Sequence, residues 1–323
     1  MKVDGKSFEI YKNQRPKVLL LGNGLNRAFN SESWSDFLRS IKNDERYPLD
    51  PEKYILPMGL KAAMLSDGQL MQSLKKYNYK LNNTYCCDKQ ELLDILYQIV
   101  SLPFDYILTT NYSYEIELAL SHKRQLNNKE IAKFMNFTEG KGAEKRYFLH
   151  TYNSVKAKNH EYQIWHIHGE YRKPESMVIG QYYYGNLLYC YNKVLKDNIP
   201  EYVHNIKKSQ EQRINSWVDA FILGDVYMVG LGMDFAETDL WWLLEKKSVQ
   251  TAGIPGKTIF YNPKNLDDTL SQNTEDYVNE NKCKKNLIGT YGVEIRDLQT
   301  TIYNNSNYID FYKKIISEMN SIW

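Results

Sequence analysis

Short apolar runs that end in glycine or small polar residues recur along this chain, and stretches with helical spacing separate them. The clearest run is residues 17–21, Lys-Val-Leu-Leu-Leu, which ends in Gly-Asn-Gly at residues 22–24. Residues 225–229 repeat the pattern and end in Gly-Leu-Gly at residues 230–232. Runs that are apolar throughout are typical of parallel strands buried on both faces. The chain is therefore expected to alternate buried strands with helices.

Further strands are indicated at residues 104–110, 162–168, 257–261 and 292–295. Parallel strands need crossover connections, which the intervening helical stretches supply. We therefore expect an α/β fold, with a Rossmann-like, mostly parallel sheet and helices on both faces. The whole chain, residues 1–323, is expected to form a single domain.

Two long segments with helical spacing fall between these strands. Residues 43–102 predict an inserted helical lobe, and residues 181–223 predict a helical lid. Residues 146–152 indicate a short strand, and residues 266–281 indicate a helix. Residues 43–102 carry no phosphate-binding or metal-binding signature.

The composition is that of a folded protein without a strong charge. Hydrophobic residues make up 42% and charged residues 25% of the chain, which is near the average for globular domains. Lys and Arg number 41 against 39 Asp and Glu, a net charge of +2. No global field would attract nucleic acid or an anionic membrane, so neither is expected as a partner.

The four cysteines, Cys86, Cys87, Cys190 and Cys283, contain no C-x-x-C pair, which argues against a zinc ribbon. No stretch approaches the roughly 20 apolar residues of a membrane-spanning helix. No secretory apolar segment follows Met1. A cytoplasmic protein with reduced thiols is therefore expected.

Glycine and polar residues follow several of the expected strands. The carboxyl ends of parallel strands meet at one edge of a sheet, and ligands of such folds bind there. A glycine loop lets backbone N–H groups approach a pyrophosphate. Residues 22–24 supply such a loop, although a plain tight turn explains a pair of glycines equally well.

Two polar side chains are candidates for chemistry at this edge. The amide of Asn111 can hold a ribose hydroxyl or a water, although Asn is also common at turns. His168 is a candidate base because imidazole titrates near neutrality. With His166 it forms an H-x-H pair, but no acidic or cysteine cluster at matching spacing supports a metal site, so none is expected. His166 is interpreted as structural.

Taken in order, these segments resemble the NAD-binding domain of sirtuins, and more closely the sirtuin-like NAD hydrolases of bacterial antiphage defence. The similar segments are residues 22–27, 109–112, 166–169 and 230–232. The resemblance implies that Asn111 and His168 are catalytic. It also implies that the dinucleotide lies along Gly22, Asn23, Gly24, Asn26, Thr110, Gly230, Gly232 and Asp239. Asp239 is equally well interpreted as a helix cap.

The resemblance implies that the chain is an enzyme, an NAD glycohydrolase that forms nicotinamide and ADP-ribose. Its expected role is NAD depletion in abortive infection, in a homo-oligomer that a partner protein or phage trigger activates. An NAD-dependent protein deacylase and a non-catalytic NAD or ADP-ribose sensor are the alternatives.

The sequence departs from the sirtuin pattern in three ways. The zinc-binding cysteine quartet of the deacylating sirtuins is missing, which weakens the deacylase alternative. Ser113 stands where many relatives carry Asp. The first glycine loop lacks the sirtuin alanine and serine, and its Gly-Asn-Gly form also resembles a second abortive-infection family.

Overall fold

One large sheet organises the protein, and most of its strands are parallel. This computed structural model describes residues 6–29, 72, 74–75, 84–136, 146–233, 237–250, 253–265, 275–300 and 305–323. The sheet order is β12 (Glu294–Thr300), β11 (Thr258–Asn265), β10 (Asp225–Val229), β2 (Lys17–Leu21), β4 (Tyr106–Thr109), β8 (His160–His166), β7 (Tyr152–Ala157) and β6 (Met135–Asn136). The strands from β12 to β8 are mutually parallel. The last two, β7 and β6, run antiparallel at one edge.

Alternate residues of the central strands enter two separate hydrophobic cores. Leu19, Leu21 and Ile107 face one core, whereas Leu20 and Leu108 face the other. This period of two follows from strand geometry, because successive side chains point to opposite faces. All of these residues are at most 1% exposed, so β2 and β4 are buried on both faces, as their continuous apolar sequence predicts.

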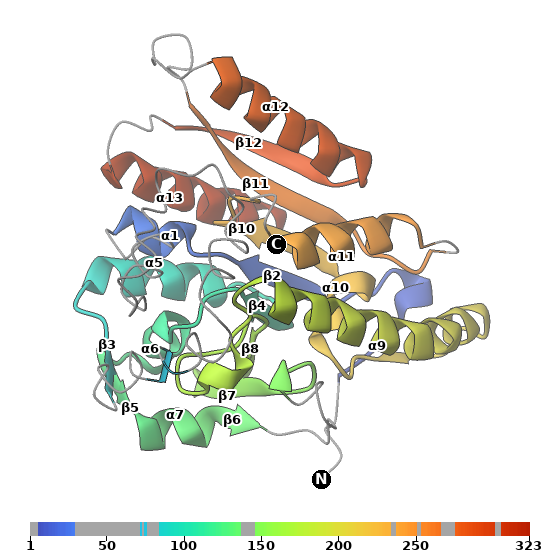
Figure 1. The fold of residues 1–323 in the computed structure, drawn as a ribbon, viewed down its shortest axis with the longest axis horizontal. Helices are drawn as coiled ribbons and strands as arrows, with labels where there is room; N and C mark the ends of the chain where they lie inside the picture. Colours follow the sequence, from blue (N-terminus) through green and yellow to red (C-terminus); the bar gives the residue numbers. More distant parts are fainter. Residues whose placement is uncertain are drawn as a thin grey trace.

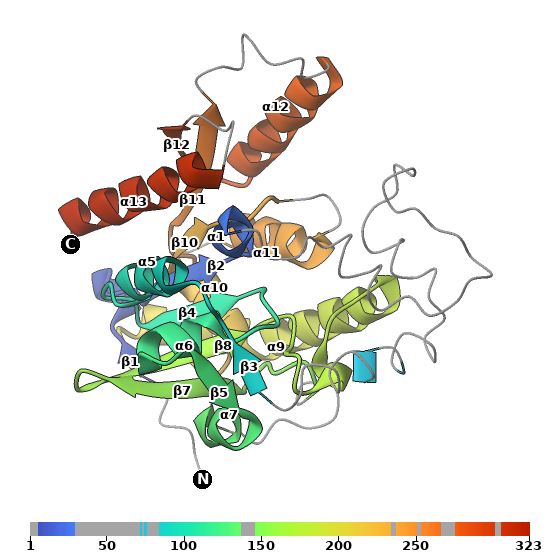
Figure 2. The ribbon, with the colours of Figure 1, turned by 90° about the vertical axis from the view of Figure 1, so that its left-hand side faces the viewer.

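Helices cover both faces of the sheet (Figures 1 and 2). One face carries α1 (Gly24–Ala28), α5 (Gln90–Val100), α6 (Glu115–Ser121), α7 (Asn128–Phe134) and α13 (Asn305–Ile322). The other face carries α9 (Gln181–Lys207), α10 (Trp217–Leu223), α11 (Thr238–Ser248) and α12 (Glu275–Thr290). The expected Rossmann-like α/β architecture is therefore confirmed.

Smaller elements complete the described part of the chain. Two short antiparallel pairs lie outside the main sheet: β1 (Ser7–Phe8) with β9 (Gln212–Arg213), and β3 (Thr84–Cys86) with β5 (Gln125–Asn127). Two single turns of 3₁₀ helix are η1 (Ile10–Lys12) and η2 (Pro174–Ser176).

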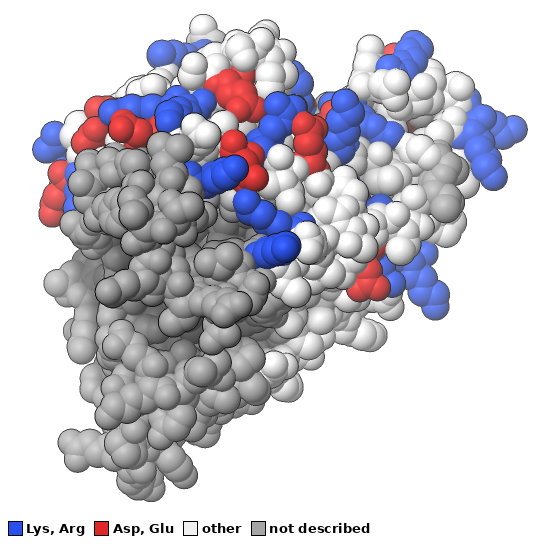
Figure 3. All heavy atoms as spheres, turned by 90° about the horizontal axis from the view of Figure 1, so that it is seen from above, with Lys and Arg blue, Asp and Glu red and all other residues white. Residues whose placement is uncertain are grey.

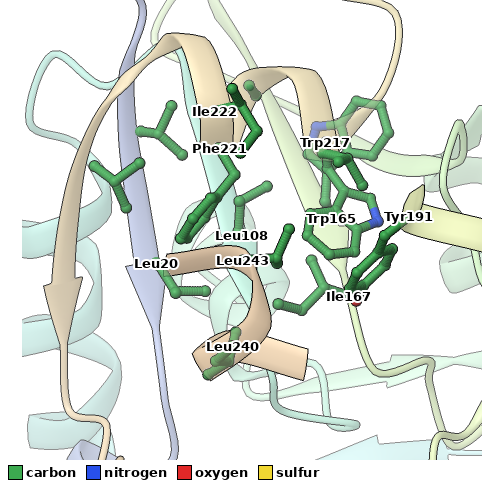
Figure 4. Packing of buried hydrophobic residues seen from close by; sticks show 14 of the residues in the cluster. Leu20, Leu108, Trp165, Ile167, Tyr191, Trp217, Phe221, Ile222, Leu240 and Leu243 are labelled. Atoms are coloured by element: carbon green, nitrogen blue, oxygen red, sulfur yellow. The ribbon is translucent and has the colours of Figure 1, made fainter. Parts of the chain in front are cut away.

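The helices α9 and α10 are fastened to each other by a buried carboxylate. Asp219 closes a capping box with Ser216 at the start of α10. The same carboxylate accepts hydrogen bonds from Tyr202 and Asn198 of α9. Trp217 packs edge-on against Tyr191 of α9, with ring centroids 4.9 Å apart. Figure 4 shows this aromatic contact beside the strands, so α9 is held against the core near its midpoint.

The helix α11 is anchored to the sheet at its C-terminal end. The ammonium group of Lys247 donates to the carbonyl oxygens of Phe221 and Gly224, both at 2.8 Å, and of Lys257 at 3.1 Å. Lys247 is 4% exposed. Three carbonyl acceptors satisfy all three N–H donors of this buried group. These bonds tie the last turn of α11 to the segments just before β10 and β11.

Two sequence-based expectations need correction. The strand expected at residues 146–152 begins instead at Tyr152, because residues 146–150 form a turn. The helix expected at residues 266–281 is α12, Glu275–Thr290, and residues 266–274 lie outside the described part.

The expected helical insertion at residues 43–102 also lies mostly outside the described residues. Within that range, α5 is helical and β3 is a short strand. Residues 181–223 are largely helical, as expected. Their role as a lid stays a prediction.

The surface shows a mixture of charges. Lysine and arginine side chains are interspersed with aspartate and glutamate over the described part of the face in Figure 3. No described helix is long and apolar enough to cross a membrane.

Candidate functional site

Four adjacent parallel strands end at the same level of the sheet. Val229 of β10 is level with Leu21 of β2, Leu21 is level with Thr109 of β4, and Thr109 is level with His166 of β8. The residues that follow these strands therefore meet at one edge. They include every residue implied by the sirtuin resemblance except Asp239, which reaches the edge from α11.

The two glycine turns are bonded to each other. The Gly22 N–H donates to Val229 O at 2.9 Å, and the Gly24 N–H donates to Gly230 O at 2.8 Å. A Cβ atom built on Gly22 would lie 2.5 Å from Gly230 O and 2.6 Å from a methyl group of Leu231. Position 22 therefore requires glycine because any side chain would clash with the second glycine turn. Gly230 has a φ of +69°, in the region that favours glycine.

Part of this edge remains open to a ligand. Gly232 is exposed, and a Cβ atom built on it would have no neighbour within 4 Å among the described residues. Asn23, in the first glycine turn, is also exposed, whereas Asn26 is only 3% exposed. A dinucleotide could thus approach Asn23 and Gly232, and these exposed residues of the two turns fit that group.

Alanine at the two glycines is expected to have different effects on stability. Gly22→Ala forces backbone apart and should cost about 1–3 kcal/mol of unfolding free energy. Gly232→Ala adds a methyl group that meets none of the described residues, at a φ outside the left-handed region, so its cost should stay within about 0.5 kcal/mol. Chemical denaturation of both purified variants measures this difference. Equal losses would contradict the contacts described for Gly22.

Asn111 is held from three sides. Its backbone N–H donates to Thr109 Oγ1 at 3.1 Å, and its side-chain Nδ2 donates to Gly22 O at 3.4 Å. Its carbonyl oxygen accepts from His166 Nδ1 at 2.7 Å. Asn111 is 8% exposed, so its amide is fixed in place at the junction of β2, β4 and β8. Thr110 donates its N–H to Leu21 O at 3.3 Å and lies beside the same junction.

His166 is a buried cation that joins Asn111 to α6. Its Nε2 lies 2.8 Å from Glu117 Oε1, and Glu117 also accepts from Asn153 Nδ2 at 2.7 Å. A carbonyl oxygen can only accept, so Nδ1 carries a proton; Nε2 needs one to donate to the carboxylate. Burial lowers the pKa of His166, but the charge and hydrogen bond of Glu117, the charge of Glu170 and the bond to Asn111 raise it to about 9.

His168 makes a second buried histidine–carboxylate pair. It follows β8, and the turn after it has Gly169 at a φ of +87°. His168 Nε2 lies 2.9 Å from Asp239 Oδ2, and the two residues are 4% and 0% exposed. Burial lowers the pKa of His168, but the charge of Asp239, the hydrogen bond to it and the charge of Glu237 outweigh burial and raise the pKa.

The structure therefore brings the two candidate catalytic residues to one edge. Ile167, between the two histidines, donates its N–H to Thr109 O at 2.9 Å. This bond ties the end of β8 to β4 and keeps His168 near the turn that holds Asn111. The amide of Asn111 can orient a hydroxyl group, and the imidazole of His168 can accept a proton. Such a pair suits hydrolysis or group transfer at a sugar carbon.

Two residues of the site were missed by sequence reasoning. Glu117 is a carboxylate between the apolar residues Ile116 and Leu118, and that charge in an apolar setting was the available signal. Tyr191, whose hydroxyl donates to Asp239 Oδ2 at 3.2 Å, is one of 27 tyrosines and carried no signal. Within the described ranges, no group of three or more His, Cys, Asp or Glu side chains is arranged to hold a metal ion.

A comparison with protein families identifies a related domain family. Residues 105–216 match the model of the SIR2-like domain family. This segment contains Asn111, His166 and His168, but it contains neither the first glycine turn nor Asp239. A search of curated proteins gives no match. The match supports a sirtuin-like family for the segment that carries both candidate catalytic residues, and with it an NAD-related activity.

Proposed function

We propose that this chain is an NAD glycohydrolase, which cleaves the bond between nicotinamide and ribose. The observation that carries the proposal is the convergence of Asn111 and His168 beside the two glycine turns at one edge of a parallel sheet. Ligands of open α/β sheets bind at this edge. The SIR2-like match over the segment with both side chains points to NAD as the substrate.

The reaction requires one water molecule. The C1′–N1 bond breaks, and its electron pair returns to the pyridinium ring, which leaves as neutral nicotinamide. The water oxygen bonds to C1′ and releases one proton, so the products are nicotinamide, ADP-ribose and H⁺. The site has to orient the ribose and the water and to accept that proton.

Each residue of the site is assigned a role in this reaction. The amide of Asn111 orients the ribose or the water. The neutral imidazole of His168 accepts the proton and passes it to solvent. Gly22, Asn23, Gly24, Asn26, Thr110, Gly230 and Gly232 line the edge along which the dinucleotide lies. His166 holds Asn111 through its backbone and does not itself need to touch the substrate.

Incubation of the purified full chain with NAD tests the proposal. We expect free nicotinamide and ADP-ribose in equal amounts, without any peptide, as measured by chromatography. Nicotinamide release only in the presence of an acyl-lysine peptide would indicate a deacylase. Calorimetric binding of NAD or ADP-ribose without products would indicate a sensor. Either of these two results would replace the proposal.

We further propose that the activity serves antiphage defence by NAD depletion and is low at rest. Constant NAD hydrolysis would harm the host cell, so self-association, a partner protein or a phage trigger should activate it. The same incubation is therefore made over a range of protein concentrations. A specific activity that rises with protein concentration is the result expected of activation by self-association.

A further inference from the structure

The carboxylate of Asp239 lies directly against the imidazole of His168. Asp239 is in the first turn of α11, and 71 residues separate it from His168. Its side chain is fully buried, and no side-chain capping bond joins the described residues at the N-terminus of α11. The two hydrogen bonds recorded for Asp239 Oδ2 come from His168 and from Tyr191. The carboxylate is therefore committed to the histidine and to α9.

This contact determines which nitrogen of His168 can act as a base. A carboxylate oxygen only accepts hydrogen bonds, so Nε2 of His168 carries a proton and donates it to Asp239. In the neutral imidazole, the lone pair is then on Nδ1. The partner of one ring nitrogen decides the role of the other in catalytic histidines generally.

We propose that Asp239 is a positioning residue for NAD cleavage, which fixes the tautomer of His168 so that Nδ1 accepts the proton, while Tyr191 holds the carboxylate in place. This inference rests on the proposed function. Because Asp239 is 0% exposed, it acts through His168 and does not bind the dinucleotide itself. Its second oxygen, Oδ1, is buried without a hydrogen-bond partner among the described residues, so the charge acts mainly on the His168 side.

Among the described residues, charged and titratable groups reach His168 and its partner Asp239 from the start of α11 and from α9. Asp239 and Glu237 lie at the start of α11, and both raise the pKa of His168 against the effect of burial. Tyr191 and Tyr184 lie on α9; Tyr191 bonds Asp239, and the Tyr184 ring packs edge-on against His168 at 5.7 Å. Without the charge of Asp239, only Glu237 opposes the effect of burial, so the pKa of His168 should fall. Removing the Tyr191 hydroxyl takes away a hydrogen bond to the Asp239 carboxylate. The negative charge of Asp239 then acts more strongly on His168, and the pKa of His168 should rise.

Two variants are therefore expected to shift the titration of His168 in opposite directions. The ring nitrogens of ¹⁵N-labelled histidine are followed by NMR from pH 4 to 10, with His168→Gln to assign the signal. Asp239→Asn should lower the midpoint by about one pH unit or more. Tyr191→Phe should raise it. If Asp239 and Tyr191 had only structural roles, the two substitutions would not shift the His168 midpoint in opposite directions.

Tyr202→Phe is the matched control for Tyr191→Phe. Tyr202 is also a buried tyrosine of α9 that donates to a buried aspartate, but that aspartate is Asp219 of α10. The His168 midpoint should be unchanged in this variant. Circular dichroism checks that each variant folds. If Asp239→Asn does not fold, the His168 midpoint in Tyr191→Phe tests the proposal: a rise supports it, and an unchanged midpoint contradicts it.

Kinetics provides the second measurement. In Asp239→Asn, the rate constant kcat for nicotinamide release should fall about 10²–10⁴-fold with little change in KM, because the amide can donate to Nε2 and favour the wrong tautomer. In Tyr191→Phe, the acidic limb of the pH profile should move to higher pH.

The outcomes separate this inference from the proposed function. Coincident His168 midpoints in the wild type and in both variants would overturn the role of Asp239, whether or not NAD is cleaved. A wild-type protein that cleaves no NAD under any condition tested would overturn the proposed function. Shifted midpoints in such a protein would still establish the coupling of Asp239 to His168.

Discussion

Replacing His168 by alanine is expected to lower kcat/KM for nicotinamide release by about 10²–10⁴-fold, which is the usual contribution of a general base. His168 is 4% exposed and lies two residues after β8, next to Ile167, whose N–H donates to Thr109 O of β4. Alanine removes the proton acceptor and leaves a small cavity beside Asp239. The measurement is steady-state release of nicotinamide by purified wild type and variant at pH 7.5.

A histidine at the other end of β8 provides the control. His160 is the first residue of β8 and is exposed, whereas His168 follows the last residue of that strand. His160→Ala should keep wild-type turnover. Asn111→Ala should lose turnover together with His168→Ala, because it removes the group that orients the ribose or water. Full activity in both His168→Ala and Asn111→Ala would remove the site assignment.

The central strands could be predicted from the sequence because a strand buried on both faces has a continuous run of apolar residues. Residues 17–21 and 225–229 are apolar runs, and the structure makes them β2 and β10 with the same bounds. Their parallel pairing then places the residues that follow them at one edge. This is why Gly22, Asn111 and His168 could be grouped without any proximity in the sequence.

The antiparallel edge of the sheet was harder to predict. In β7, buried and more exposed residues alternate, but one of the buried positions is Asn153, which bonds Glu117. A polar side chain at a core position hides the period of two that marks a half-buried strand. The strand was therefore expected six residues too early.

The carboxylate partners of His166 and His168 could not be predicted from the sequence either. Glu117 reaches His166 across 49 residues, and Asp239 reaches His168 across 71. Such pairs depend on how α6 and α11 pack against the sheet, and local sequence patterns do not predict that packing. The sequence favoured cofactor contact or helix capping for Asp239, whereas its buried carboxylate bonds His168 and Tyr191.

Glu117→Gln is expected to destabilise the protein by about 3–5 kcal/mol, the usual cost of removing one partner of a buried ion pair. His166 has both ring N–H groups engaged, by Asn111 O and by Glu117 Oε1, and is 3% exposed. Glutamine keeps the volume but removes the negative charge, which leaves a buried imidazole without its counterion. Urea denaturation at pH 6.5 measures the loss.

The adjacent Glu115 is the matched control. It lies on the same helix, is 8% exposed, and bonds Ser113 and Tyr85 instead of a cation. Burial raises the pKa of Glu115, so a charge there is unfavourable and the neutral amide of Glu115→Gln should cost less than Glu117→Gln. Equal losses in the two variants would contradict the ion pair.

The pH dependence of stability tests the same pair independently. The pKa of His166 is about 9 in the folded protein against an ordinary 6.5, a difference that corresponds to about 3 kcal/mol. Because the folded value is the higher one, this stabilisation is complete below pH 6.5 and is lost as the pH rises through 9. In Glu117→Gln, burial without a counterion disfavours the charged ring, so the variant should lose stability on acidification instead. The stability gap between wild type and variant should therefore be widest near pH 6 and should narrow towards pH 9; a gap independent of pH would show that His166 is not a cation in the folded protein.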